Sequence, residues 1–226
     1  MLYPGLTTAQ FEYFVTALMN SSLSNVTLDM SYVTAITEIG DETFNGCTNI
    51  TSVILPSSLE TIGDKAFYEC TNLTSVTIAE GTTTIGSYAF YKCTALKTVT
   101  IGSSVTTIGD FAFSRCSALT VTIPDSVTSI GSSAFYYCAS LKTAVIGDGV
   151  ATIPTWAFSQ CTSLTTVTIG SSVTTIGDYA FNSCSSIETV VYNGTKSDWE
   201  SISIGSYSNT YLTNATISCT DGVYGF

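Results

Sequence analysis

The side chains with the most reactive chemistry are cysteines that recur at an almost fixed spacing. They are Cys47, Cys70, Cys93, Cys116, Cys138, Cys161 and Cys184, and Cys219 stands outside this column. Thiols form disulfides, bind metals and act as nucleophiles. Cysteines stacked in a column would present parallel Cβ vectors, which is poor disulfide geometry, and no Cys-x-x-Cys pair offers a metal site. We therefore expect free buried thiols, with no metal and no cofactor.

Acidic residues form a second column, at Asp41, Asp64, Asp110 and Asp178. Paired carboxylates hydrolyse glycosidic bonds, and clustered ones bind calcium. The dense spacing of calcium-binding repeats is absent, and the sequence singles out no pair. Because aspartate also favours turns, we interpret this column as turn chemistry on a solvated edge. We expect no catalytic residue and no enzymatic activity.

The composition excludes several classes of function. The chain has no histidine, which removes Ser-His-Asp and Cys-His catalysis and histidine-based zinc sites. Its net charge of −11 disfavours nucleic acid and anionic lipid as partners. No apolar run approaches the roughly 20 residues that span a bilayer, so we expect no membrane insertion. The first residues, MLYPGLTTAQ, lack the basic and long apolar regions of a signal peptide.

A repeat of 22 or 23 residues explains the spacing of both columns. Phenylalanine recurs at steps of 23, 23, 23, 22, 23 and 23, and a cysteine follows three residues after each one. These residues are Phe44, Phe67, Phe90, Phe113, Phe135, Phe158 and Phe181. Such a period predicts a solenoid, in which each coil buries its apolar columns against the next. The single short step comes from a residue missing between Leu119 and Val121, where we expect a local irregularity.

The repeat over residues 96–116 shows the expected elements. Threonines alternate with Val99 and Ile101, which predicts a short strand with one buried face. The segment IGD predicts a turn, and AFSRC is long enough only for a single 3₁₀ or helical turn. The glycine of IGD becomes Pro154 in the sixth repeat, so we interpret the glycine column as close packing and not as a need for positive φ.

Both ends depart from the repeat, as the caps of a solenoid do. We divide the single domain 1–226 into an N-terminal cap with a degenerate first coil (1–38), seven repeats (39–192) and an irregular C-terminal cap (193–226). The N-terminal cap should hold a helix capped by Thr7 or Thr8. Its apolar residues, with those of the first strand, are Phe11, Phe14, Val15, Leu18, Met19, Leu23, Val26 and Leu28. After an Asn193-Gly194 turn we expect a lid of short strands carrying Trp199, Ile202, Ile204, Leu212 and Ile217.

The segment LKTVTIGSSVTTIGDFAFSRC resembles the BspA-like leucine-rich repeat, also called the Treponema pallidum type. The resemblance extends from Ile39 to about Tyr192, and the tail YNGTKSDWESISIG is similar to the ending of this family. The chain departs from the pattern at Thr43, at Pro154 and in the 22-residue repeat. Membership implies a curved leucine-rich repeat solenoid, mostly strand and turn, with a strand on its concave face. It also implies a cell-surface or secreted role in adhesion and partner binding, without fixed catalytic residues.

The outward positions of the strands form the first candidate surface, a ladder of threonines. A flat exposed strand face favours threonine by β-propensity alone, but solenoids also bind partners through such faces. Regular Thr-x-Thr arrays also resemble ice-binding solenoids, although the pattern is ordinary in this family. We predict that the concave face contacts a protein or glycan through Thr77, Thr98, Thr100, Thr120, Thr122, Thr143, Thr166, Thr168 and Thr189. We expect the chain to act as a monomer.

An aromatic column precedes the alanine of each AF pair and provides the alternative surface. Its members are Tyr88, Phe111, Trp156 and Tyr179, and Ser133 interrupts it. Packing between turns explains such a column, because a repeat places like residues side by side. A stacking platform for sugars is the other interpretation, which would make the chain a carbohydrate-binding or glycan-processing module.

Overall fold

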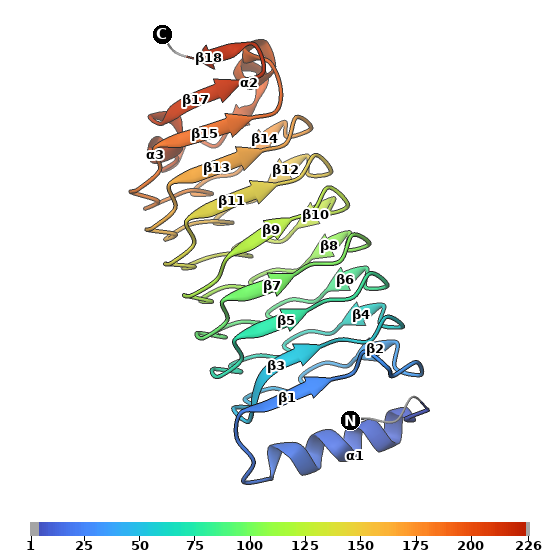
Figure 1. The fold of residues 1–226 in the computed structure, drawn as a ribbon. Helices are drawn as coiled ribbons and strands as arrows, with labels where there is room; N and C mark the ends of the chain where they lie inside the picture. The colour runs from blue at the N-terminus through green and yellow to red at the C-terminus, as the bar shows by residue number, and fades with distance from the viewer. Residues whose placement is uncertain (1–4, 225–226) are drawn as a thin grey trace.

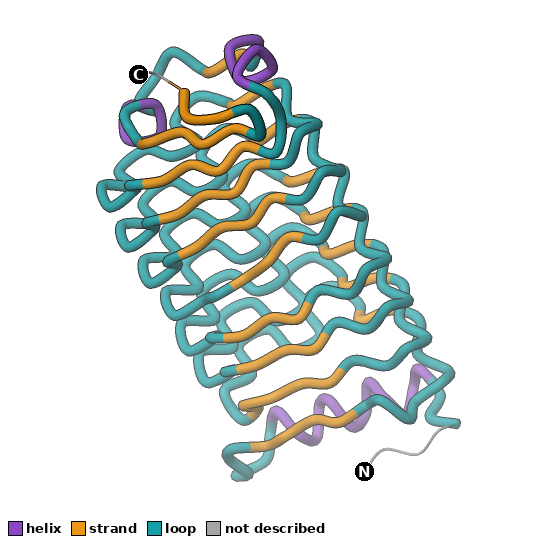
Figure 2. The backbone as a smooth tube through the Cα atoms, turned by 45° about the horizontal axis from the view of Figure 1, so that its top comes forward, coloured by secondary structure: helices purple, strands orange, loops and turns teal. Residues whose placement is uncertain are grey.

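Successive repeats wind into coils, and each coil places its residues directly above those of the coil before it (Figure 1). The computed structural model describes residues 5–224, so residues 1–4 and 225–226 of the two expected caps lie outside the described part. Neighbouring coils pair through parallel strands in two separate ladders (Figure 2). The predicted solenoid of strands and turns is confirmed.

The longer strand of each coil belongs to what we call the long-strand ladder. Its strands are β1 (Val26–Asp29), β3 (Ile50–Ile54), β5 (Ser75–Thr77), β7 (Thr98–Thr100), β9 (Val121–Ile123), β11 (Thr143–Ile146), β13 (Thr166–Ile169), β15 (Thr189–Tyr192) and β17 (Thr216–Cys219), with β18 (Gly222–Tyr224) as an antiparallel edge. Within β7 the central Val99 is buried and the flanking threonines are exposed. The expected alternation of buried and outward residues is therefore present.

A second ladder of two-residue strands, here the short-strand ladder, runs along the other side of the coils (Figure 1). The sequence pattern of this region predicts only a turn. The isoleucine of IGD and the residue before it, which is threonine or serine except for Glu38 in β2, instead form strands, and the isoleucine is buried, as in β8. The strands are β2 (Glu38–Ile39), β4 (Thr61–Ile62), β6 (Thr84–Ile85), β8 (Thr107–Ile108), β10 (Ser129–Ile130), β12 (Thr152–Ile153), β14 (Thr175–Ile176) and β16 (Ser203–Ile204).

A continuous stack of phenylalanines forms the centre of the core. The rings of the AF column are fully buried and nearly parallel, and Phe67 and Phe90 lie 5.1 Å apart between centroids. The widest step, 5.5 Å, joins Phe113 to Phe135 across the 22-residue repeat. Phe11 of the N-terminal helix closes the lower end of the stack with an edge-on contact to Phe44. The phenylalanine column is thus core, as expected.

The glycine column packs against the backbone of the preceding coil. A Cβ built on Gly109 would lie 2.6 Å from the main chain of Gly86, and neither glycine has a positive φ. The interpretation as close packing is confirmed. Positive φ occurs instead at two non-glycine positions of the coils, before the alanine and before the cysteine, as in Tyr88 and Lys92 at 57°. This left-handed conformation is rare for bulky residues and was not foreseen.

The N-terminal cap is the helix α1 (Thr8–Met19), and Thr7 caps it. The Thr7 side chain accepts from the main-chain N–H of Gln10, whose own side chain accepts from the N–H of Thr7. The expected apolar residues Phe11, Val15, Leu18 and Leu28 are buried, and Phe14 and Val26 pack against the core. The expectation is wrong for two residues of this apolar set, because Met19 is 38% exposed and Leu23 is 61% exposed. Met19 ends the helix, and Leu23 precedes the first strand.

The C-terminal cap corrects the expected lid of short strands. Two short helices, α2 (Lys196–Ser201) and α3 (Thr210–Thr213), bury Trp199 and Leu212. Ile204 and Ile217 lie in β16 and β17, as strand residues should. Thr195 and Asp198 form a capping box at the start of α2. The sequence TKSD was a readable helix-start signal for this box.

Candidate functional site

The nine predicted threonines lie together on the outward side of the long-strand ladder, and we call this surface the threonine face. Neighbouring strands place them in register, with Thr77 beside Thr100 and Thr166 beside Thr189. The threonines from Thr77 to Thr143 are exposed, whereas Thr166, Thr168 and Thr189 are half-buried. The structure therefore brings the predicted residues together on one surface.

The long-strand ladder is interrupted once, between β7 and β9. One sheet ends at β7 and the next begins at β9, and a single bridge joins Thr98 to Thr120. This is the position of the 22-residue repeat, so the predicted irregularity is confirmed. The neighbouring valines become slightly accessible: Val99 is 6% and Val121 is 7% exposed, against 0% for Val167 in the continuous part.

A groove of about 490 Å³ lies along this interruption. Such a volume is within the range of about 300–1,000 Å³ typical of ligand sites. Five residues of the threonine face line it, namely Thr98, Thr100, Thr120, Thr122 and Thr143. Apolar side chains, including Val99 and Val121, complete the lining together with Lys142. The groove thus offers hydroxyls, apolar surface and one ammonium group, which suit the binding of a ligand.

A second interruption lies one coil further along, in the short-strand ladder between β10 and β12. Elsewhere in this ladder the glycine N–H donates to the isoleucine carbonyl of the preceding coil, as Gly131 does to Ile108 at 2.7 Å. Pro154 occupies that position in the sixth repeat and has no N–H to donate to Ile130. The coil between the two interruptions carries β9 and β10. It pairs with the preceding coil through β8–β10 and with the following coil through β9–β11.

The aromatic column stacks in two groups, as its repeat position predicts. Tyr88 and Phe111 lie 4.8 Å apart between ring centroids, and Trp156 and Tyr179 lie 4.3 Å apart. Ser133 separates the groups. Tyr207, which was not predicted, extends the second group: it stacks on Tyr179 at 5.7 Å and is 58% exposed. Tyr207 lies in the C-terminal cap, outside the repeat period, so the spacing gave no signal for it.

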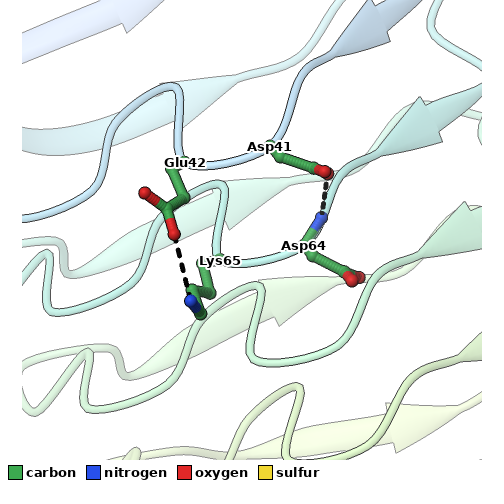
Figure 3. Close-up of polar contacts among 4 residues, drawn as sticks. All are labelled: Asp41, Glu42, Asp64 and Lys65. Atoms are coloured by element: carbon green, nitrogen blue, oxygen red, sulfur yellow. Dashed lines mark hydrogen bonds and ion pairs between the residues drawn. The ribbon is translucent and has the colours of Figure 1, made fainter.

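The acidic column links the turns of successive coils. A carboxylate oxygen of Asp41 accepts from the main-chain N–H of Asp64 at 2.7 Å (Figure 3). Asp64 accepts in the same way from Ser87, also at 2.7 Å. Beside them Glu42 pairs with Lys65 at 3.0 Å, and the hydrogen bond from Lys65 lowers the pKa of the Glu42 carboxyl. The turn interpretation of this column is confirmed.

A second acidic column escaped sequence analysis. Glu80 accepts from the N–H of Ser103, Asp125 from that of Asp148, and Asp148 from that of Ser171. The signal was an acidic residue at a recurring turn position, at the far end of the long strands. No group of three or more acidic, cysteine or histidine side chains within residues 5–224 is arranged to hold a metal ion.

The cysteine column is buried and its thiols are unpaired, as expected. Each thiol from Cys70 to Cys184 donates to the carbonyl of the phenylalanine in the preceding coil, as Cys116 does to Phe90 at 3.1 Å. Burial raises the pKa of the Cys116 and Cys138 thiols above the ordinary range. Cys219 is also free and is half-buried. The column is therefore a structural element with protonated, unreactive thiols.

Comparisons with known proteins agree with this geometry. A family model described as the BspA type leucine rich repeat region matches residues 15–142 and 108–222. The solved leucine-rich repeat protein of T. pallidum is similar at 31% identity and a TM-score of 0.66, over 71% of this chain and 78% of that one. A leucine-rich repeat protein from Bacteroides ovatus shares the fold at 22% identity and a TM-score of 0.59, over 83% and 60% of the two chains. No curated protein matches the sequence.

One further finding concerns membranes. Among residues 5–224, no helix combines the length and the apolar character that crossing a bilayer requires.

Proposed function

Because the chain belongs to the BspA-type leucine-rich repeat family, we propose that it is a non-catalytic binding and adhesion protein that recognises a protein or glycan through its threonine face. Proteins of this family are generally binding or surface proteins. A location at the cell surface or outside the cell is part of this proposal, as is a monomeric state. Protease treatment of intact producing cells tests the location, and light scattering of the purified chain tests the monomer.

The observation that carries the proposal is the concentration of accessible hydroxyls on one ladder. The threonine face is in register over most of its length and contains the 490 Å³ groove. Acidic side chains elsewhere accept main-chain hydrogen bonds at the turns, and the thiols are buried. The exposed threonine face thus combines a ligand-sized groove with groups available to a partner.

Substitutions on the two faces of the solenoid test this proposal. The probes are arrays of glycans and of purified surface proteins, scored with the unmodified chain, with Thr100→Arg and with Thr106→Arg as the matched control. Thr106 is exposed on the side that leads into β8 of the short-strand ladder. We expect Thr100→Arg to remove binding and Thr106→Arg to retain it. Equal binding by all three chains would contradict the proposal.

The aromatic column supports a second candidate function, glycan binding by ring stacking. Trp156, Tyr179 and Tyr207 form a continuous stack that ends in an exposed ring. Aromatic faces of this kind contact the apolar faces of sugar rings. Trp156→Ala and Tyr207→Ala should then weaken binding on the glycan array. Unchanged binding by both variants removes this candidate.

A further inference from the structure

The interruption between β7 and β9 leaves two strand edges facing one groove without a ladder between them. Thr120 donates its N–H back to the Lys97 carbonyl at 2.9 Å. Main-chain groups alternate sides along a strand, so Thr122, two residues later, directs its N–H and C=O toward β7 as well. Within residues 5–224, the pairing of β7 with β9 does not extend beyond the Thr98–Thr120 bridge.

The opposite edge, that of β7, is also open beyond the bridge. The Thr100 carbonyl accepts from Ile78 of the preceding coil at 2.9 Å, so Thr100 faces away from the groove. The alternate residues Val99 and Ile101 therefore direct their main-chain groups toward β9. In the continuous part of the ladder the Ile146 carbonyl, at the position of Ile101, accepts from the N–H of Gly170. Pro124 stands at the position of Gly170 and has no N–H.

The missing residue explains why the edges separate. In other coils two successive N–H groups share one carbonyl at the start of the strand, as Thr165 and Thr166 share that of Lys142. This bulge holds an extra residue, and the 22-residue repeat lacks it between Leu119 and Thr120. Thr120 alone pairs with Lys97, and the strand then diverges. The open edge is thus set by the sequence of this one coil.

Positive charge surrounds the beginning of these strands in a chain whose net charge is −11. Lys142 lines the groove, and Lys97 directly precedes Thr98. The ion pairs within residues 5–224 are those of Lys65 and Lys92, so Lys97 and Lys142 lack a carboxylate partner there. At the other end of the groove Asp125 follows Pro124 and is exposed. The groove therefore has positive charge at and beside the start of the strands, and an acidic residue follows its lining at their end.

We propose that this groove binds an extended acidic peptide segment by strand addition. The peptide main chain pairs with the main-chain groups of Ile101 and Thr122, which lie beyond the bridge, and its carboxylates contact Lys142 and Lys97. The open edge accommodates about four residues at about 3.3 Å per residue. An anionic glycan satisfies the lysines but not the alternating main-chain donors and acceptors, so the peptide is the favoured occupant. The inference rests on the proposed binding function and names its ligand class.

The first experiment uses a defined probe, the fluorescein-labelled hexapeptide Glu-Val-Glu-Val-Thr-Val, in fluorescence polarisation. We expect saturable binding that is at least tenfold weaker for a peptide with lysine at both glutamate positions. N-methylation of alternate peptide nitrogens on either register should also weaken binding at least tenfold. Equal binding by the methylated peptides, or binding only of an oligogalacturonate probe, overturns strand addition.

Variants of the protein locate the site. Inserting one lysine between Leu119 and Thr120 restores the 23-residue repeat, closes the edge and should reduce hexapeptide binding at least tenfold while the chain stays folded by circular dichroism. Lys142→Glu should reduce binding at least fivefold, and Lys196→Glu, with the same change of charge in the C-terminal cap, should leave it unchanged. Full binding by the insertion variant overturns the proposal.

Amide hydrogen exchange provides an independent readout. In the free protein we expect the amides of Ile101 and Thr122 to exchange at least tenfold faster than those of Ile146 and Thr168, which stand at the same repeat positions in the continuous ladder. The hexapeptide should slow the first pair only. Exchange of all four amides at equal rates overturns the proposal. If Thr100→Arg abolishes array binding while no hexapeptide effect is seen, the proposed function stands and this inference alone fails.

Discussion

Two stretches of the long-strand ladder, built from almost the same repeat, differ in whether their strands pair. From β11 to β15 three strands match over four residues each, and the central residues Ala144, Val167 and Val190 are buried. Between β7 and β9 one bridge remains, and a groove follows it. A single missing residue thus separates a continuous sheet from an open strand edge.

The core does not share this interruption. The phenylalanine stack crosses it with a step of 5.5 Å, compared with 5.1 Å in the steps on either side. At the turn, the N–H of Phe113 still donates to the Ala134 carbonyl at 2.8 Å. The comparison teaches that the solenoid can open one face while its interior and its turns stay continuous. Variants in the two stretches test whether the core and the sheet can be separated in this way.

Ionisation of the buried thiols should give the largest effect, a loss of stability at alkaline pH. The loss per thiol should be the same beside the interruption and in the continuous part of the ladder. Burial raises the pKa of Cys116 beside the interruption and of Cys161 in the continuous part. A thiol with a raised folded pKa stabilises the fold below the unfolded pKa of about 8.5, and this contribution is lost as the pH rises above it. Each such thiol should lower the free energy of unfolding by about 1.4 kcal/mol per pH unit above that value.

Urea denaturation at pH 7, 9 and 10 measures this slope. Cys116→Ala and Cys161→Ala should each make the decline less steep by the contribution of one thiol, and by the same amount. A wild-type stability that is constant from pH 7 to pH 10 would show that the thiols ionise in the folded chain.

Truncation of the phenylalanine stack should be the next largest effect. Phe113→Ala and Phe158→Ala should each lower the free energy of unfolding by about 3–5 kcal/mol, because both rings are fully buried. Urea denaturation at pH 7 gives both values. A loss below about 1 kcal/mol for Phe113 alone would mean that the core, and not only the sheet, is open at the interruption.

Restoring the missing residue should have a smaller effect of opposite sign. A lysine inserted between Leu119 and Thr120 should allow Ile101 and Thr122 to form ladder hydrogen bonds, and should raise the free energy of unfolding by about 1–2 kcal/mol. A lysine inserted between Leu141 and Lys142 is the control and should destabilise, because it breaks the register of β11 with β13. Destabilisation by both insertions would refute the account of the missing bulge residue.

The smallest change is expected for Pro154→Gly at the second interruption. The restored N–H can donate to the Ile130 carbonyl, which stabilises the folded state. Glycine also increases the conformational entropy of the unfolded chain, and this destabilises the fold by about the same amount. The free energy of unfolding should therefore change by less than about 0.5 kcal/mol. Amide exchange at residue 154 should nevertheless be protected, as at Gly131. Exchange at the rate of an unstructured peptide would mean that the proline is not what divides the short-strand ladder.

Much of the fold was predictable because the same local pattern occurs in seven successive repeats. The period fixed the phenylalanine and cysteine columns as core, and Thr7 was readable as the cap of α1. The 22-residue step after Leu119 marks the coil at which the long-strand ladder is interrupted. Leu23, Tyr207 and the helices of the C-terminal cap lie outside the period, so the repeat pattern did not predict how they are placed.

The sequence by itself determined the solenoid, its core columns and the coil at which the ladder changes. Only the tertiary structure decided that the irregular coil opens a groove, that a second ladder accompanies the first, and that Pro154 divides it. The physical reason is that the burial of a core position follows from the apolar character of its own side chain, whereas the pairing of a strand edge requires two coils to be in register. Whether Ile101 and Thr122 are paired is settled by the register between those coils.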